Sequence, residues 1–154
     1  MTVQNQLSVK VKNKFLLHLL GAIWVFPATI LVWLFYILPL WLIWKDLEFK
    51  GWYEPFIAQF QLSNYKLEPW HARRWKDWYG VGLPCAFIYK DLETTADDIY
   101  SLKTCRHESR HCKQWFVFGI FFYLFYLIES IFQKMKGMDP YRDNRFEVDA
   151  RAHE

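Results

Sequence analysis

The stretch His107-Glu108-Ser109-Arg110-His111 decides most of what the sequence predicts about the fold. On an α-helix its two histidines lie on one face, about one turn apart, so both imidazoles can bind one metal ion. Glu108 lies beside that face, where its carboxylate can take a proton from a water molecule that the metal activates. The pattern therefore predicts a helix with a Zn²⁺ site, in which His107 and His111 are ligands and Glu108 is the general base.

A third protein ligand is expected, because catalytic zinc sites use three protein ligands and leave the fourth position to water. Residues 146–152 form a short segment rich in helix formers, and Glu147 within it is the candidate. The alternative interpretation of Glu147 is a solvated charge in a tail of mixed acidic and basic residues. If Glu147 is a ligand, its segment must fold back onto the helix that carries the histidines.

The segment around Glu147 resembles the glutamate helix of the gluzincins, the zincin metallopeptidases whose ligand Glu is followed by x-x-Ala and often by Asp. Glu147 and Ala150 match that pattern, whereas Arg151 stands where the Asp is often found, and Asp149 is the candidate to replace it. The last third of the chain is also similar to small bacterial and phage proteins with H-E-x-x-H-x-x-Q, an aromatic helix and Y-R-x-N-x-F-E-x-E/D-A. The resemblance implies a zinc-dependent metallopeptidase that hydrolyses amide bonds of a peptide or protein substrate.

Three further residues are candidates for supporting roles. Gln114 lies one turn beyond His111 and could hydrogen-bond a neighbouring carbonyl, or could equally be a helix-surface residue. Tyr141 or Arg142 could donate to the oxyanion of a tetrahedral intermediate, with plain packing as the alternative.

The composition of this 154-residue chain is unusual, at 53% hydrophobic and 21% aromatic residues. A small soluble core cannot bury this many aromatic side chains. Some of them are therefore expected to contact lipid. The net charge of +3 is small and the basic residues are interleaved with acids, so no nucleic-acid partner is expected. The three cysteines form no C-x-x-C pair and cannot all be disulfide-bonded. Cys105 and Cys112 could share a helix face but are interpreted as small buried residues. The oligomeric state stays open.

Residues 15–44 contain no Asp, Glu, Lys or Arg and follow a polar segment, residues 1–14. The run exceeds the roughly 20 residues needed to cross a bilayer, so it predicts a transmembrane or membrane-embedded helix. Pro27 and Pro39 are expected to kink or break it. The Lys and Arg residues around it favour a cytoplasmic N-terminus, and the resemblance to bacterial proteins implies the bacterial inner membrane. The side of the membrane on which the site lies stays open.

Residues 45–93 are predicted to form an aromatic and basic region at the membrane interface, because Trp and Tyr favour the headgroup layer. The alternative is ordinary packing against the helices. Within this region, residues 80–84 predict a loop and residues 85–89 a short strand. By resemblance to zincins, residues 85–89 are the candidate edge strand that would pair with an extended peptide substrate.

Residues 94–154 are predicted to form the zincin-like, metal-binding helical domain. Thr and Asp residues between 94 and 98 supply capping groups for a helix that should run through His111 to about Phe118. The predicted fold class is therefore mainly α: a membrane-anchored, minimal zincin-like helical domain with at most a short β element.

Residues 115–132 form a second apolar run that is long enough to cross a bilayer. As a straight span it would place His111 and Glu147 on opposite faces of the membrane, about 30 Å apart. Both residues can bind one ion only if the chain folds back, either by a turn near Gly119 or as a tilted helix whose apolar face rests in one leaflet, with residues 137–144 returning to the site. A site enclosed within membrane helices is a further possibility.

A second class of function stays open at this point. The two apolar runs and the aromatic residues would suffice for a non-enzymatic envelope protein of a phage or bacterium. The H-E-x-x-H pattern would then be accidental or a structural metal site. Topology discriminates between the two classes, because a double span removes Glu147 from the metal.

Overall fold

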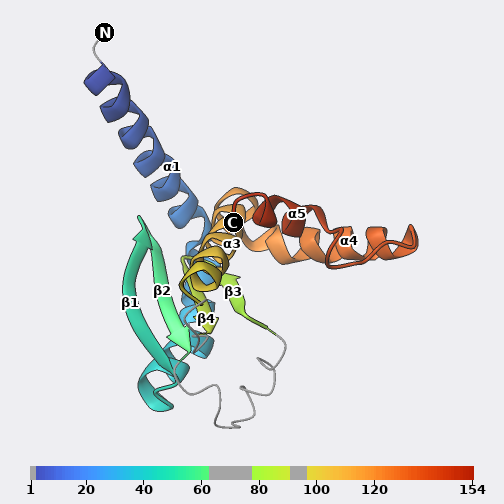
Figure 1. The fold of residues 1–154 in the computed structure, drawn as a ribbon. Coiled ribbons are helices and arrows are strands. Elements are labelled where there is room, and N and C mark those ends of the chain that lie inside the picture. The colour runs from blue at the N-terminus through green and yellow to red at the C-terminus, as the bar shows by residue number, and fades with distance from the viewer. Residues whose placement is uncertain (1–2, 63–77, 91–96) are drawn as a thin grey trace.

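The structure is a computed structural model that describes residues 3–62, 78–90 and 97–154, with side chains from residue 15 onward and, in the last range, from residue 102. The predicted helix start at residues 94–96 lies outside the described residues. So do the aromatic and basic residues between 63 and 77. The described chain is mostly helical and contains one small β-sheet (Figure 1).

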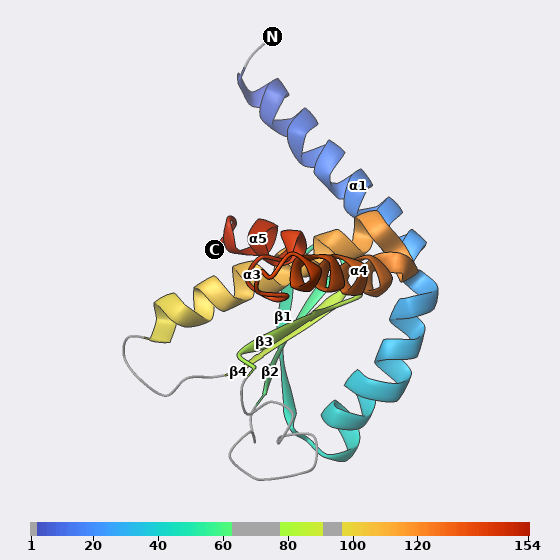
Figure 2. The ribbon, with the colours of Figure 1, turned by 90° about the vertical axis from the view of Figure 1, so that its right-hand side faces the viewer.

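The first apolar run is one continuous helical segment. α1 (Val3–Val32) is followed by two π-helical turns, η1 (Trp33–Ile37) and η2 (Pro39–Ile43). Pro39 has no N–H to donate, so the α-helical hydrogen-bond pattern is interrupted there, and one of the wider π-helical turns ends just before Pro39 while the other begins at it. The segment curves along its length (Figure 2, blue to cyan). Residues Phe15–Ile43 are long and apolar enough to cross a membrane, and most of their large side chains are exposed.

Four strands form a single sheet: β1 (Leu47–Glu54), β2 (Ile57–Leu62), β3 (Gly80–Leu83) and β4 (Ala86–Lys90). Their order is β1-β2-β4-β3, with β2 and β4 parallel and the other pairs antiparallel. The expectation of at most a short β element is therefore wrong. In β2, Ala58, Phe60 and Leu62 are buried and alternate with glutamines, which is the period-2 pattern of a strand.

The prediction of a loop at residues 80–84 is wrong, because most of them form strand β3. β3, and not residues 85–89, is therefore the terminal strand on this side of the described sheet. Residues 86–89 of the predicted strand lie in β4, whereas Cys85 lies in the turn before it. β4 pairs with β2 on one side and β3 on the other, so it is no edge. Gly80 and Gly82 indicated a loop by composition. Their small size instead allows close packing, because a Cβ on Gly82 would lie 2.4 Å from the Cβ of His111.

Both faces of the sheet are covered. Phe87 faces α3 (Asp97–Phe118) in a cluster with Cys112 and Trp115. Its neighbour Ile88 points to the opposite face, toward the π-helical turns. Cys105 and Cys112 are buried and form no disulfide, as expected of small packing residues. Cys85 is half-buried and also forms no disulfide.

The second apolar run bends where the sequence predicts it. α3 ends at Phe118, the 3-10 turn η3 (Gly119–Phe121) follows, and α4 (Phe122–Met135) leaves in a new direction. Gly119 has a φ of +60°, and a Cβ there would lie 2.2 Å from the indole nitrogen of Trp24 on α1, so only glycine fits.

The chain then folds back. A turn at Gly137, with a φ of +75°, leads to α5 (Arg145–Arg151), which packs against α3. Figure 1 shows α4 and α5 projecting together to one side of the body. By length and composition Leu102–Met135 is also a candidate membrane span. The predicted turn near Gly119 and return of the chain are confirmed, and a straight double span is not what the chain forms.

Candidate metal centre

The two histidines of α3 and Glu147 of α5 meet in the interior. His107 Nε2 lies 3.2 Å from Glu147 Oε2, His111 Nε2 lies 3.4 Å from Glu147 Oε1, and the two Nε2 atoms are 3.2 Å apart. All three side chains are buried, and their ligand atoms lie within 4.8 Å of one another. The structure thus brings together the three residues that the sequence predicts as ligands.

Outer hydrogen bonds orient both imidazoles toward the centre of this cluster. His107 Nδ1 lies 3.0 Å from Glu154 Oε1, and His111 Nδ1 lies 2.8 Å from Gln114 Oε1. Both partners are oxygen acceptors, so each Nδ1 carries the ring proton and each Nε2 presents a lone pair to the centre. This is the tautomer that a metal ligand requires.

The cluster has an excess of acceptors that a cation would satisfy. Two imidazole lone pairs and a carboxylate converge, and in this tautomer no N–H donates to buried Glu147 Oε2, although His107 Nε2 lies 3.2 Å away. A buried acceptor that lacks a partner costs about 1–3 kcal/mol. A metal ion between His107, His111 and Glu147 would remove that cost, so the residues present fit such an ion.

A proton and a metal ion are alternatives for this position, as the shifted pKa values indicate. Burial alone raises the pKa of Glu147, but contacts with both imidazoles and the hydroxyl of Tyr126 outweigh it and lower the pKa. Burial favours neutral His111, yet Glu147, Glu108 and Gln114 together raise its pKa. Without a metal, the carboxylate stays ionised and His111 tends to hold a proton beside it.

Glu108 lies next to the ligands and faces the edge strand β3. A Cβ on Gly80 would lie 2.6 Å from Glu108 Cγ, so the carboxylate is packed tightly against the strand. The pKa of Glu108 is raised to about 8: burial is the largest cause and Glu147 adds to it, while His111 and the backbone N–H of Gly82 act in the opposite direction. A cation in the cluster would favour the ionised form of Glu108, which is the form that accepts a proton.

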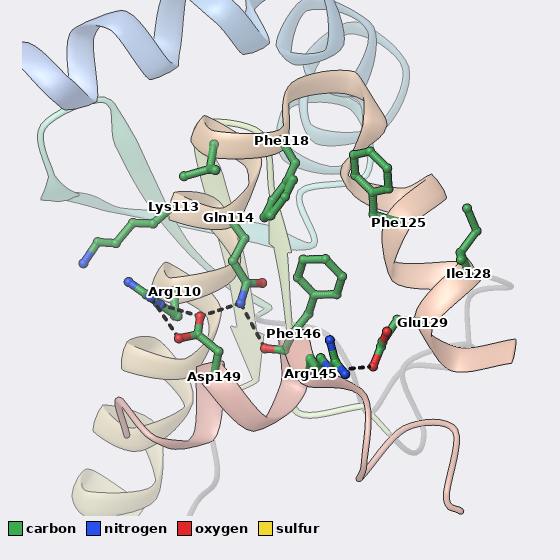
Figure 3. Close-up of a pocket in the computed structure, with 11 residues that line it drawn as sticks. Arg110, Lys113, Gln114, Phe118, Phe125, Ile128, Glu129, Arg145, Phe146 and Asp149 are labelled. Atoms are coloured by element: carbon green, nitrogen blue, oxygen red, sulfur yellow. Dashed lines mark hydrogen bonds and ion pairs between the residues drawn. The ribbon is translucent and has the colours of Figure 1, made fainter. Parts of the chain in front are cut away.

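A hydrogen-bonded chain joins α3 to α5 behind the histidines (Figure 3). Gln114 Nε2 donates to Phe146 O at 3.0 Å and to Asp149 Oδ2 at 2.8 Å, which leaves its oxygen free for His111. Arg110 donates to both oxygens of Asp149, at 2.7 and 2.9 Å, and this contact is the main reason that the pKa of Asp149 is lowered. Gln114 and Asp149 therefore support the site, and the expected bond from Gln114 to a carbonyl is confirmed.

The two candidates for an oxyanion donor differ in position. Tyr141 is 56% exposed, but its hydroxyl is close enough to Glu147 and Glu108 that these carboxylates, added to partial burial, raise its pKa. Arg142 is exposed, and its carbonyl accepts a hydrogen bond from Arg151. Only Tyr141 is placed to donate near the metal ligands.

Three residues that sequence reasoning missed also belong to the site. Tyr126 on α4 donates to Glu147 Oε1 at 2.8 Å, and Glu154 contacts His107 as described above. Asn144 is fully buried and caps α5 by accepting a hydrogen bond from the Phe146 N–H at 2.9 Å. Only Asn144 carried a local signal, because Asn before a helical segment is a preferred N-cap.

In chemical terms, the site is a buried group of two nitrogens and one carboxylate, with a second carboxylate beside it that can hold a proton. Comparison of the chain with protein-family models, curated proteins and solved structures gave no match. Function is therefore inferred from the geometry of the site.

Proposed function

We propose that the chain is a membrane-anchored, zinc-dependent metallopeptidase of the zincin type. The observation that carries the proposal is the convergence of His107, His111 and Glu147 at one place, with Glu108 beside them and β3 as the terminal strand among the described strands. The gluzincin resemblance of the H-E-x-x-H and Glu147 segments supports the same conclusion.

Zinc suits this group because it accepts imidazole nitrogen and carboxylate oxygen as ligands in a set of three. When bound, zinc lowers the pKa of a coordinated water and polarises a carbonyl group. His107, His111 and Glu147 would hold it, and Glu154, Gln114 and Tyr126 would orient them.

The residues around the metal ligands can carry out the proton transfers of amide hydrolysis. Glu108 takes a proton from the attacking water and passes it to the leaving amine, and the Gly82 N–H holds its carboxylate in position for both steps. The Tyr141 hydroxyl donates to the substrate carbonyl oxygen as negative charge develops there.

Strand β3 supports a peptide as the substrate. Among the described strands it pairs with β4 alone, and an extended peptide could add to its other edge through the backbone groups that do not already bond Glu108 and Trp115, as those of Gly82 do. Because α3 packs on β3, such a peptide would lie beside Glu108 and His111. This assigns the substrate-pairing role to residues 80–83 instead of 85–89.

The first apolar segment supports a location at a membrane. Phe15–Ile43 exposes apolar side chains along its length, and α1 packs directly on α3, the helix of the metal site. The site then lies close to the bilayer, so membrane-proximal proteins are the substrates that it would meet. The resemblance to bacterial proteins favours the bacterial inner membrane.

The test combines metal content with cleavage of a quenched fluorescent peptide library by detergent-purified full-length protein. We expect about one zinc per chain and cleavage in the wild type, zinc without cleavage in Glu108→Gln, and neither in His111→Ala. Full activity of Glu108→Gln, or a wild type that takes up no zinc, contradicts the proposal.

A further inference from the structure

In helix α4 most polar side chains are turned inward and most apolar side chains outward. Among the described residues, those of α4 that contact α5 or its preceding turn through polar atoms are Tyr126, Glu129 and Ser130. Apart from Lys134, the exposed side chains are large and mostly apolar: Tyr123, Leu124, Phe125, Leu127, Ile128, Ile131, Phe132 and Met135. A patch of this size is unfavourable in water and indicates a surface that something apolar covers.

The length and surroundings of α4 fit one leaflet of a lipid bilayer. Its 14 residues extend roughly 21 Å, which is less than the roughly 30 Å of a bilayer core. At its base, Trp24 of α1 packs on Gly119, so the apolar surface of α4 adjoins the exposed apolar surface of Phe15–Ile43. The patch is therefore continuous with the segment that is long and apolar enough to span a membrane.

Charge at the far end of α4 agrees with a lipid partner. Residues 134–145 contain four basic residues (Lys134, Lys136, Arg142 and Arg145) and two acidic residues (Asp139 and Asp143), a net charge of 4 − 2 = +2. The Lys136 ammonium lies 4.1 Å from the Phe132 ring centroid, at the border between the apolar helix and this basic turn. Such a border suits anionic headgroups above an acyl layer.

A groove extends this surface toward the metal centre. Its volume is about 630 Å³, and Phe125 and Ile128 of α4 form one side of it (Figure 3). Gln114 and Asp149, the residues that orient His111, form the other side. An acyl chain that entered the groove would contact the outer hydrogen bonds of the site.

Hydrogen bonds couple α4 directly to the third ligand. Tyr126 donates its hydroxyl proton to Glu147 at 2.8 Å. The Asn144 amide donates to Tyr126 O at 3.1 Å and to Ser130 Oγ at 2.8 Å, and the same side chain caps α5. The position of Glu147 therefore depends on the position of α4.

We propose that α4 docks into one leaflet of an anionic bilayer and that this docking holds Glu147 in place for metal binding. The inference rests on the proposed zinc site. Lipid contact keeps α4 against α5, and Tyr126 transmits that position to Glu147. When α4 is displaced, the metal loses a correctly oriented carboxylate ligand.

Docking is tested by cysteine labelling of the full-length protein in vesicles of phosphatidylcholine and phosphatidylglycerol. A water-soluble maleimide should not label Leu127→Cys, whose native side chain is 57% exposed in the structure, until detergent is added. Met138→Cys, in the turn after α4 and 46% exposed, should be labelled in both conditions. Equal labelling of both variants in vesicles overturns docking.

Coupling is tested by zinc affinity in the same vesicles, measured by competition with a chromophoric chelator. Tyr126→Phe should weaken zinc binding by about 10-fold or more, as for other residues that orient metal ligands. Ile131→Val, which likewise removes one heavy atom, at an exposed residue of the same helix, is the control and should bind like the wild type. Leu127→Lys should weaken binding, because Lys resists burial in hydrocarbon, and Met138→Lys should not.

The outcomes separate this inference from the proposed function. Unchanged zinc affinity in both Tyr126→Phe and Leu127→Lys overturns the coupling and leaves the metallopeptidase proposal intact. A wild type that binds no zinc overturns the proposed function and the coupling together, whereas the labelling result still decides whether α4 docks.

Discussion

Helices α3 and α4 follow one another in the chain, but α3 buries several polar side chains whereas α4 exposes many apolar ones. α3 buries His107, Glu108 and Gln114, while α4 exposes Leu124 and Leu127. In water alone both arrangements are unfavourable, because buried polar groups need partners and exposed apolar groups need cover. The two proposals account for this difference, with a cation at the buried polar groups of α3 and lipid on the apolar surface of α4.

Removing the metal should break the α3 side of this comparison and is the largest effect we expect. If zinc is present at 1,000 times its Kd, its removal lowers the free energy of unfolding by about 4 kcal/mol. The measurement is denaturant unfolding in detergent, with and without a chelator, followed by tryptophan fluorescence. Glu147→Ala, which lacks the third ligand, should show a much smaller response to the chelator. Equal stability of the wild type with and without zinc contradicts the prediction.

Gly82→Ala should lower the stability of the protein because α3 packs tightly on β3, whereas a substitution on the exposed surface of α4 should have little effect. The Cβ of Gly82→Ala would lie 2.4 Å from His111 Cβ and 2.7 Å from the Glu108 carbonyl oxygen. Relieving these contacts requires movement of α3 or β3, and we expect a loss of about 3 kcal/mol, the upper part of the range for overpacked cores. The control is Leu124→Ala on the exposed surface of α4, which in detergent should change stability by about 0.5 kcal/mol or less.

Asn144 connects the two regions, and its replacement should loosen one from the other. Asn144→Ala removes the cap of α5 and both bonds to α4, with an expected loss of about 2 kcal/mol. Asn144→Asp keeps an oxygen for the Phe146 N–H but loses the amide donor to the Tyr126 carbonyl. Asp should therefore restore the α5 cap and leave zinc affinity reduced. If zinc affinity in both variants equals that of the wild type, Asn144 acts only as a cap.

What could be predicted from the sequence is mostly local in the chain. His107, Glu108 and His111 are connected by helical periodicity, and the turn at Gly119 follows from a single residue type. Glu147 could be predicted because a third ligand is required and because its segment resembles the glutamate helix of the gluzincins. The prediction that the chain returns to bring it there depended on a distance argument.

The rest of the fold depends on pairing between segments that are far apart in the sequence. β2 and β4 are parallel neighbours separated by residues 63–85, and no local pattern sets that pairing. The glycines of β3 were interpreted as loop residues. Glycine is needed there because the strand packs closely on His111 and Glu108, and this contact exists only in the folded chain. The role of Tyr126 was not predicted for a similar reason, because a tyrosine within an apolar run does not indicate that its hydroxyl hydrogen-bonds a carboxylate of a distant segment.

The pH dependence of zinc binding gives the smallest effect and tests the claim that proton and metal compete on α3. The pKa of His111 is raised from its ordinary value of 6.5, because Glu147, Glu108 and Gln114 together outweigh the effect of burial. Below that raised pKa the proton on His111 must leave before zinc binds, so affinity falls by about tenfold per pH unit for each proton displaced. Above it, His111 is neutral and contributes no pH dependence. Chelator competition at pH 8, 7 and 6 measures this slope, and His153→Ala, at an exposed histidine outside the cluster, should leave it unchanged. An affinity that stays constant from pH 8 to pH 6 would mean that zinc does not displace a proton from His111, and the buried polar groups of α3 would then need a different explanation.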